Sequence, residues 1–361
     1  MRFPPGWPVL HRGASSAPTP TEKYIIQFGG VRTPAQFLAS QVEIQTNEFN
    51  GGVMRIQGTD ATLGGLFNLD QQVSVAYSIP YAVYATSLTT TQSITFTQWT
   101  QNFLLLNVAR PGTANLADAG ELASFVNNIS VAAQVAEAAG FVGVVLDMEA
   151  YDSSIFWSYP DQPAGPTFAD RQADYVAAGE AVIAGIEAAF GVAAAQVVIA
   201  VSYEQLKNTV GAAALEASRY GLLPSFLDGL HNDATTAKLI CLCEEAYVNT
   251  TAADMDADIA LQTPPTVPWL GSANYANVHL DGLATWLDAA PPTFSYTDVE
   301  SNYFTPAGFR NALELMLARV DKYCFVYTNS ATRWPGMVPA EPTDDEAVPA
   351  EYVAVLNAVN S

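Results

Sequence analysis

The sequence is poor in positive charge. It has 14 lysines and arginines, four of them lysines, against 36 aspartates and glutamates, and its formal net charge is −22. Nucleic acid and anionic membrane surfaces would be repelled by such a chain, so neither is expected as a partner. A neutral carbohydrate meets no such repulsion and fits this composition.

Cysteine and histidine are also scarce, with three residues of each. Cys241 and Cys243 lie in one apolar run, which predicts core residues rather than a disulfide framework. His11, His231 and His279 show no metal-site spacing and no nucleophile partner. We therefore expect no metal, no cofactor and no serine–histidine–aspartate triad.

Unbroken apolar runs of about twenty residues are missing, so no membrane span is expected. The first twenty residues contain a basic residue, but prolines and a tryptophan interrupt the apolar core that an intact signal peptide needs. We expect residues 1–22 to form an extended arm. The expected location is extracellular or at the cell surface, without an intact signal peptide.

Short, continuous apolar runs alternate with longer helical patterns from residue 23 onward, as parallel strands covered on both faces require. The predicted strands are 23–29, 51–57, 102–108, 141–147, 196–203, 238–247 and 322–328, with a less regular one near 293–298. Seven or eight such units over about 300 residues predict an α/β fold, a (β/α)8 TIM barrel.

Helix signals support this organisation. Thr33 and Thr305 each precede a proline, which predicts an N-cap followed by proline at the first helical position. One main domain is expected over 23–334, with an insertion at 58–101 that decorates the barrel mouth. Residues 335–361 read as a linker rich in proline and acid, followed by a short C-terminal helix.

The stretch GFVGVVLDMEAYD ends a buried strand with acids. Asp147 and Glu149 lie two residues apart, so both point to the same side of the strand. In a parallel barrel they would face the mouth at the carboxyl end of the fourth strand, where active sites of this fold lie. The alternative is a pair of solvated loop acids, because strand ends often carry aspartate.

A second acidic motif, LCEEAY, closes the run at 238–247. Glu244 and Glu245 point to opposite sides, so one of them faces the mouth. Carboxylates from two strands in one cleft are what glycoside hydrolysis requires. We expect Glu149 to be the general acid, with its pKa raised by Asp147 and burial, and Glu244 to be the nucleophile or the base for a water. Assistance by a substrate acetamido group beside Asp147 and Glu149 is the open variant.

Aromatic residues follow the first motif in YDSSIFWSYP. Trp157 and Tyr159 are the expected platforms for sugar rings, and ordinary loop packing is the equally weighted alternative. The acidic triplet Asp254, Asp256 and Asp258 lacks the glycine and the last glutamate of a calcium loop, so we interpret it as a solvated helix face.

The order of the motifs QNFLLLNV, GFVGVVLDMEAYDSSIFWSYP, LLPSFLDGL, EEAY, NYFTPAGF and KYCFVYTNSATRW resembles a family of uncharacterised TIM-barrel glycosidases found mainly in bacterial genomes. The resemblance covers about 23–334. It implies functional roles for Asp147, Glu149, Tyr151, Glu244 and Tyr247.

Three further residues in these motifs, Asn107, Asp152 and Trp334, complete the expected substrate contacts. The chain departs from the family pattern at four positions. Gln101 stands where the family has an acid, Leu105 where it has an arginine, Met148 where it has a proline and Asn329 where it has a glutamate. These losses indicate either altered specificity or a barrel that has lost its chemistry.

Two other functions stay open. A non-catalytic barrel, either carbohydrate-binding or a structural subunit of a surface, filament or viral assembly, would use its terminal segments to form homo-oligomers. A dehydrogenase or aldolase is disfavoured because the first strand has no nucleotide-binding glycine loop, and Lys238 and Lys322 stand at the starts of strands rather than at their catalytic ends.

Overall fold

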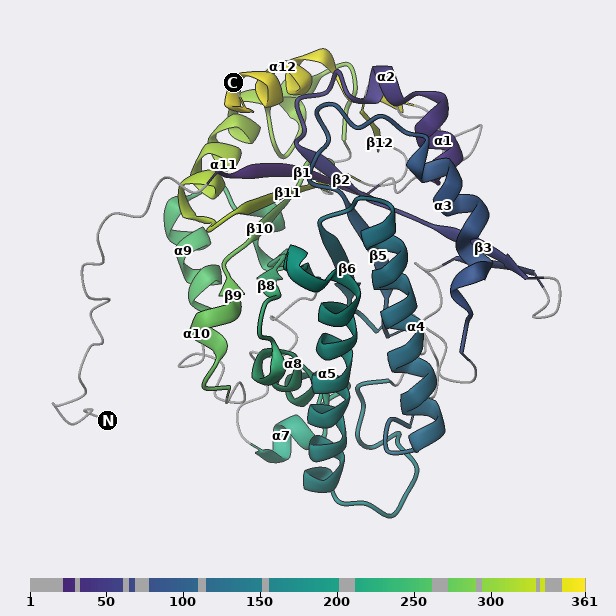
Figure 1. Ribbon diagram of the computed structural model, residues 1–361. Helices are drawn as coiled ribbons and strands as arrows, with labels where there is room; N and C mark the ends of the chain where they lie inside the picture. Colours follow the sequence, from purple (N-terminus) through teal and green to yellow (C-terminus); the bar gives the residue numbers. More distant parts are fainter. Residues whose placement is uncertain are drawn as a thin grey trace, which may run out of the picture.

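The computed structural model describes residues 22–29, 33–60, 65–68, 78–109, 115–150, 156–200, 212–261, 272–289, 294–328, 332–334 and 346–360 (Figure 1). Apart from Glu22, the expected N-terminal arm lies outside these residues.

A nine-stranded parallel sheet forms the centre of the fold, in the order β10-β11-β1-β2-β5-β6-β7-β8-β9. Its strands are β1 (Tyr24–Phe28), β2 (Gly51–Met54), β5 (Phe103–Asn107), β6 (Gly143–Asp147), β7 (Gln196–Ala200), β8 (Lys238–Cys241), β9 (His279–Leu280), β10 (Leu283–Trp286) and β11 (Tyr323–Tyr327).

The chain itself joins the two edges of this sheet. β9 pairs with β8 and β10 pairs with β11, and only Asp281 and Gly282 separate β9 from β10. A Cβ on Gly282 would lie 2.2 Å from the carbonyl oxygen of Cys241, so glycine permits this close crossing. β9 and β10 thus share one of eight strand positions, and the predicted (β/α)8 barrel is confirmed.

Helices surround the strands. They are α1 (Pro34–Ala39), α2 (Gln41–Ile44), α3 (Ala85–Gln92), α4 (Ala119–Ala138), α5 (Phe168–Phe190), α7 (Ala212–Glu216), α8 (Leu223–Asp233), α9 (Ala252–Leu261), α10 (Tyr275–Val278), α11 (Pro306–Arg319) and α12 (Ala350–Asn360). The predicted N-caps are confirmed, since the hydroxyl of Thr33 accepts from the N–H of Gln36 and that of Thr305 from the N–H of Gly308.

Two apolar layers hold the barrel together. Side chains from all eight strand positions fill the interior, with Phe103, Tyr323 and Phe325 among the largest. A second layer packs the outer strand faces against the helices. α5 and α8 approach closely because a Cβ on Gly179 would lie 2.2 Å from the carbonyl oxygen of Phe226.

By length and composition alone, one described stretch, Phe168–Ala193, is apolar enough to cross a membrane. It contains α5, which packs against α4 and α8 and buries Tyr175 and Val182 against the barrel. A helix packed against the core of a barrel can have the same length and apolar composition, so these two properties do not distinguish α5 from a membrane span.

Two strand predictions were wrong. The run at 238–247 leaves the sheet after Cys241 and turns into the 3₁₀ helix η3 (Glu244–Val248). The described part of 293–298 forms turns, and the seventh strand position is the β9–β10 segment instead. Asp281 and Gly282 break that strand into two pieces, neither of which shows a long apolar run.

The expected insertion at 58–101 contains most of an antiparallel hairpin, β3 (Gln57–Asp60) and β4 (Gly65–Asn68), followed by η1 (Tyr81–Tyr84) and α3. Four further short elements lie in connections, namely η2 (Gly191–Ala193), η4 (Val299–Ser301) and the paired strands β12 (Thr332–Arg333) and β13 (Glu346–Ala347).

The predicted C-terminal helix is present as α12, and it lies along α11 (Figure 1). Tyr352 is fully buried there, where its hydroxyl donates to the carbonyl of Phe304 at 2.6 Å and accepts from Nδ2 of Asn302 at 2.9 Å. The helix is therefore packed onto its own barrel.

Candidate active site

The two acidic motifs lie at the carboxyl ends of their strands. Asp147 is the last residue of β6, and Glu244 begins η3 just after β8. Cys243, directly before Glu244, has φ 49° and ψ 74°, a left-handed conformation that is costly for a residue other than glycine. This turn takes the chain from β8 into the barrel mouth.

A side-chain hydrogen bond joins Glu244 to Glu149. Burial raises the pKa of Glu244 well above its usual 4.5, and the nearby charges of Glu149 and Asp147 raise it further. The hydroxyl of Tyr247 donates to Oε1 of Glu244 at 2.9 Å, which acts in the opposite direction because it stabilises the ionised form. Glu244 is thus held in its protonated form beside Glu149.

This distribution differs from the sequence-based expectation, which put the raised pKa on Glu149. The raised pKa of Glu244 has two causes, its own burial and the charges of two neighbouring acids, Glu149 and Asp147. The charges of Glu149 and Asp147 favour the protonated form of Glu244, because like charges close together disfavour ionisation.

Asp147 supports this pair from inside the barrel. Its Oδ1 accepts from the backbone N–H of Glu149 at 3.1 Å, and its Oδ2 accepts from Nδ2 of Asn107 at 3.4 Å. Asn107, at the end of β5, is only 4% exposed and also accepts from the N–H of Ala109. Asn107 was expected to touch substrate, but its position makes it a support for Asp147.

The backbone after Glu149 is held from a second side. The N–H of Ala150 donates to the hydroxyl of Tyr220 at 3.0 Å, and Nη2 of Arg219 donates to the carbonyl of Ala150 at 2.5 Å. Burial raises the pKa of Tyr220, and the charges of Glu149 and Asp147 add to this effect. Neither Arg219 nor Tyr220 was singled out from the sequence, because they lie after a short helix far along the chain.

Three aromatic rings stand beside Glu244. Tyr247 stacks on Tyr327 with ring centroids 5.6 Å apart, and Trp286 meets both rings edge-on at 5.8 and 5.4 Å. Nε1 of Trp286 donates to Oδ1 of Asp288 at 2.7 Å, which fixes the orientation of the indole. Burial and the charges of the surrounding acids raise the pKa of Tyr327, which places its phenol close to the acid pair.

Of these rings, only Tyr247 was predicted as a substrate contact. Tyr327 lies at the carboxyl end of a predicted strand. Asp147 was selected for the same position on its own strand, so the same reasoning would have selected Tyr327. Trp286 was missed because its strand was missed. Among the tryptophans that the structure describes, Trp286 alone keeps part of its surface exposed, since Trp99, Trp157 and Trp334 are 0–2% exposed.

The expected roles of Trp157 and Trp334 as sugar contacts do not fit their burial. The Trp157 ring packs 4.5 Å from Phe156, and its Nε1 donates to the carbonyl of Met148 at 2.7 Å. The Trp334 ring meets Phe49 edge-on at 4.9 Å. Both indoles are core residues, and Trp157 fixes the backbone between the two acids of the first motif.

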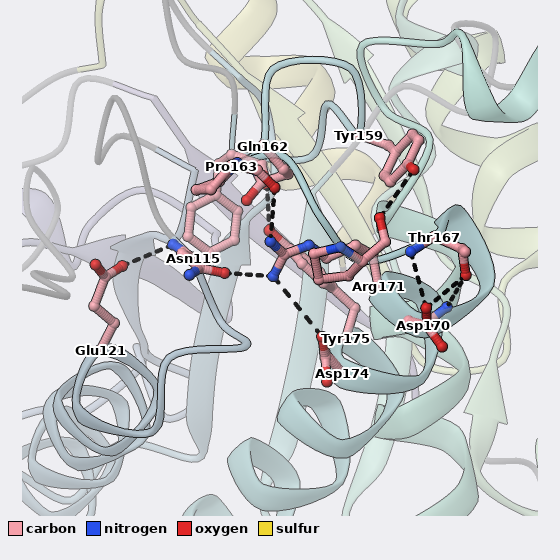
Figure 2. Close-up of polar contacts among 12 residues, drawn as sticks. Asn115, Glu121, Tyr159, Gln162, Pro163, Thr167, Asp170, Arg171, Asp174 and Tyr175 are labelled. Atoms are coloured by element: carbon pink, nitrogen blue, oxygen red, sulfur yellow. Dashed lines mark hydrogen bonds and ion pairs between the residues drawn. The ribbon is translucent and has the colours of Figure 1, made fainter.

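Tyr159 is partly buried within its own loop. Its hydroxyl, shown in Figure 2, donates to the carbonyl of Pro166 at 3.1 Å. Its ring packs with its centroid 5.1 Å from that of Phe168. Loop packing was the alternative considered for this residue. Tyr151 and Asp152, the other substrate contacts expected nearby, lie outside the described residues.

Arg171 anchors this loop to the start of α5. Figure 2 shows its guanidinium donating to Oδ1 of Asn115 at 2.5 Å and to the carbonyl of Pro163 at 3.0 Å, with Asp174 at 3.9 Å. Arg171 is only 2% exposed. A buried arginine with these partners fixes the described end of the connection between the first acidic motif and α5.

The departures from the family pattern fall in different places. Gln101 precedes β5 at the opposite end of the barrel, where its Oε1 accepts from the hydroxyl of Tyr323 at 2.9 Å. The N–H of Met148 donates to the carbonyl of Ala200 at 2.9 Å, a bond that proline would lack. Leu105 packs against the barrel interior. Asn329 lies outside the described residues.

The acidic triplet lies on α9, as its interpretation as a helix face predicted. Asp254 pairs with Thr251 at the helix start, Asp256 lies 2.7 Å from Arg319, and Asp258 accepts from Nδ2 of Asn249. Across the described ranges, no group of three or more His, Cys, Asp and Glu side chains is arranged to hold a metal ion.

No protein-family model and no curated protein matches the chain. Solved structures that match include a psychrophilic glycoside hydrolase family 10 endo-β-1,4-xylanase, 12% identical with a TM-score of 0.47, over 92% of this chain and 97% of that chain. A GH18 chitinase from Pseudoalteromonas aurantia is 9% identical with a TM-score of 0.44, over 93% and 100%. Morphinone reductase is 10% identical with a TM-score of 0.39, over 84% and 81%. At these values the similarity carries no argument about activity, and the barrel rests on its strand order.

Proposed function

We propose that the protein hydrolyses O-glycosidic bonds, with Glu244 as the proton donor and Glu149 as the second carboxylate. The observation that carries this proposal is the hydrogen bond between Glu149 and Glu244 at the carboxyl ends of two strands. Glycoside hydrolysis needs one protonated and one ionised carboxyl group on either side of the scissile bond. Glu244, whose raised pKa favours the protonated form, takes the donor's role in this proposal, and Glu149 takes the other.

In this mechanism Glu244 gives its proton to the glycosidic oxygen as the bond from that oxygen to the anomeric carbon breaks. Glu149 attacks the anomeric carbon, and a water then cleaves the glycosyl–enzyme bond after Glu244, now ionised, takes its proton. The raised pKa of Glu244 favours the protonated form that a proton donor needs. The roles are the reverse of those expected from sequence.

The close contact of the two acids favours retention of anomeric configuration. Retaining enzymes hold their carboxyl groups about 5–5.5 Å apart, whereas inverting enzymes need about 6.5–9.5 Å for a water. Glu149 and Glu244 interact directly, so their carboxyl groups have to separate less to reach the retaining distance than to reach the inverting distance. In the acetamido-assisted variant the acetamido group of the substrate would attack the anomeric carbon instead, and Glu149 would form no covalent bond to the sugar.

The aromatic rings beside Glu244 support a neutral sugar as substrate. Trp286, Tyr247 and Tyr327 are partly exposed, and aromatic faces pack against the apolar faces of sugar rings. The acids around them, Glu149 and Asp288 among others, disfavour uronic or other anionic sugars by like-charge repulsion. Neutral oligosaccharides and polysaccharides are the class to test.

The test is a screen of neutral oligosaccharides and polysaccharides, with chromatography of released sugars and NMR of the first anomer formed. On any substrate that the wild type cleaves, Glu244→Gln and Glu149→Gln should each lower kcat by at least about 10²-fold. Glu245→Gln is the matched control, because it makes the same change one residue away and should retain activity.

Two results would contradict the proposal. Full activity of Glu149→Gln or Glu244→Gln would remove the acid pair from the mechanism. Saturable binding of sugars by a folded wild-type protein that cleaves none of them would replace the hydrolase with the non-catalytic carbohydrate-binding barrel.

A further inference from the structure

A second pocket, of about 280 Å³, opens at the end of the barrel opposite the acid pair. Its walls come from the amino ends of the strands, with Tyr24 opening β1, Gln196 opening β7, Gln101 just before β5 and Lys322 just before β11. Reactions of this fold are built at the carboxyl ends of the strands. This pocket is therefore separate from the proposed active site.

Lys322 has an ammonium group without an acceptor. Nζ lies 5.0 Å from the ring centre of Tyr323 and 5.8 Å from that of Tyr24, and makes no hydrogen bond or ion pair with any described residue. The other described lysines differ, since Lys23 donates to the carbonyl of Leu317 and Lys238 to that of Asn277.

The charge of Lys322 is only partly offset nearby. Glu22 acts on it electrostatically, but the Glu22 carboxylate accepts from the hydroxyl of Tyr24 and lies beyond ion-pair distance of Nζ. Partial burial lowers the pKa of Lys322, and the described groups nearest its ammonium are the rings of Tyr24 and Tyr323.

Two amides complete the polar lining. Gln196 is 9% exposed, and its Nε2 donates to the carbonyl of Ala194, while its Oε1 has no hydrogen-bond donor. Gln101 accepts from the hydroxyl of Tyr323, and its Nε2 reaches only the hydroxyl of Thr100 at 3.5 Å, which leaves donor capacity. A buried amide oxygen without a donor is costly and marks a place for one.

The remaining wall is apolar and includes Phe141 and Phe190. It also includes Ala194, which has φ 47° in the left-handed region. Among the described residues, only Ala194 and Cys243 combine a positive φ with a side chain, and Cys243 directly precedes Glu244 in the proposed active site. Such strain concentrates at functional sites.

We propose that this pocket binds a small aromatic carboxylate that carries a hydroxyl group at the end of the ring opposite the carboxylate. The carboxylate would accept from Lys322 and Gln101, the ring would pack against Phe141 and Phe190, and the distal hydroxyl would donate to the amide oxygen of Gln196. The pocket volume equals that of roughly nine waters, which suits one ring with two small substituents.

The test is calorimetric titration of the full-length protein with 4-hydroxybenzoate, benzoate and 4-hydroxybenzyl alcohol. Saturable binding of 4-hydroxybenzoate is expected, with weaker binding of benzoate, which lacks the hydroxyl, and of the alcohol, which lacks the charge. Lys322→Met should weaken 4-hydroxybenzoate binding at least about tenfold, because a charge-assisted hydrogen bond is lost. Binding should also weaken as pH rises through the lowered pKa of Lys322.

Lys238→Met is the matched control. Lys238 opens β8 at the same end of the barrel, and its ammonium already donates to a carbonyl, so this variant should bind like the wild type. Lys322→Arg keeps the charge and should retain binding if Lys322→Met proves unstable. Glu244→Gln should bind normally, which separates this pocket from the proposed function. Absence of saturable wild-type binding at millimolar ligand, or equal losses in Lys322→Met and Lys238→Met, would overturn the proposal.

Discussion

Glu149 and Glu244 come from different strand positions of the barrel, and a hydrogen bond joins their carboxyl groups. Two acids brought together in this way cost stability whenever both are ionised, so burial and like charge favour the protonated form of Glu244. Strong pKa perturbation at a strand end of a barrel is a recognised sign of a functional site.

The acid pair should make stability depend on pH. The folded-state pKa of Glu244 lies above its usual 4.5, so below about pH 4.5 this residue is protonated in both states and carries no penalty. As pH rises through the folded-state pKa, its contribution to stability is lost. Glu244→Gln stays neutral throughout, so its melting temperature should match the wild type near pH 4 and exceed it by a few degrees near pH 8. Identical pH profiles for the two proteins would show that Glu244 is not perturbed.

Tyr247 should set the pH range of activity through Glu244. Its hydroxyl bond stabilises the ionised form of Glu244, so Tyr247→Phe should raise the pKa of Glu244 further. The alkaline limb of kcat/KM against pH should move to higher pH in this variant, with about a tenfold loss of activity at most near the optimum. Tyr327→Phe is the control, because it removes a neighbouring phenol that makes no hydrogen bond to Glu244. An equal shift in both variants would assign the effect to the aromatic stack rather than to the bond.

The sequence predicts the barrel because its strands are buried on both faces and therefore read as continuous apolar runs. It also predicts both acidic motifs, since charge at the end of such a run stands out. The meeting of Glu149 and Glu244 could not be predicted from the sequence. Their strands, β6 and β8, are not neighbours in the sheet because β7 lies between them, so only the closed fold brings the two acids together.

The misses have a common cause in local irregularity. Trp286 and Asp288 follow a strand that Asp281 and Gly282 split, so no run marked their position. Which tryptophan is exposed also depends on tertiary packing, since Trp286 at the end of β10 keeps an exposed surface whereas Trp157 in the connection after β6 is fully buried. Likewise, the raised pKa of Glu244 depends on its burial and on two acids from another strand position, which no spacing rule contains.

Trp286 should contribute to substrate affinity. Trp286→Ala removes a partly exposed ring next to Glu244 and should raise KM on a neutral oligosaccharide about tenfold or more, with a smaller effect on kcat. Trp286→Phe keeps an aromatic face and should recover part of the affinity. An unchanged KM in Trp286→Ala would remove the aromatic cluster from the binding site.

Trp157 should act on stability. Trp157→Phe keeps most of the ring packing but leaves the buried carbonyl of Met148 without its donor, at a cost of about 1–3 kcal/mol in the free energy of unfolding. Denaturant unfolding measures this loss. Because Met148 lies between Asp147 and Glu149, kcat should fall as well, while KM should change little. A raised KM with unchanged stability would restore Trp157 as a substrate contact.

Tyr352 should reveal whether α12 belongs to the barrel or links copies of the chain. Tyr352→Phe removes the hydroxyl that donates to Phe304 and accepts from Asn302, so the free energy of unfolding should fall by about 1–3 kcal/mol. Tyr303→Phe removes an exposed hydroxyl that donates to the carbonyl of Val248, and should change stability by less than about 0.5 kcal/mol. Light scattering on both variants should give the wild-type mass. If Tyr352→Phe instead lowers the mass and leaves unfolding of the single chain unchanged, α12 serves assembly, and the structural-subunit alternative gains its first support.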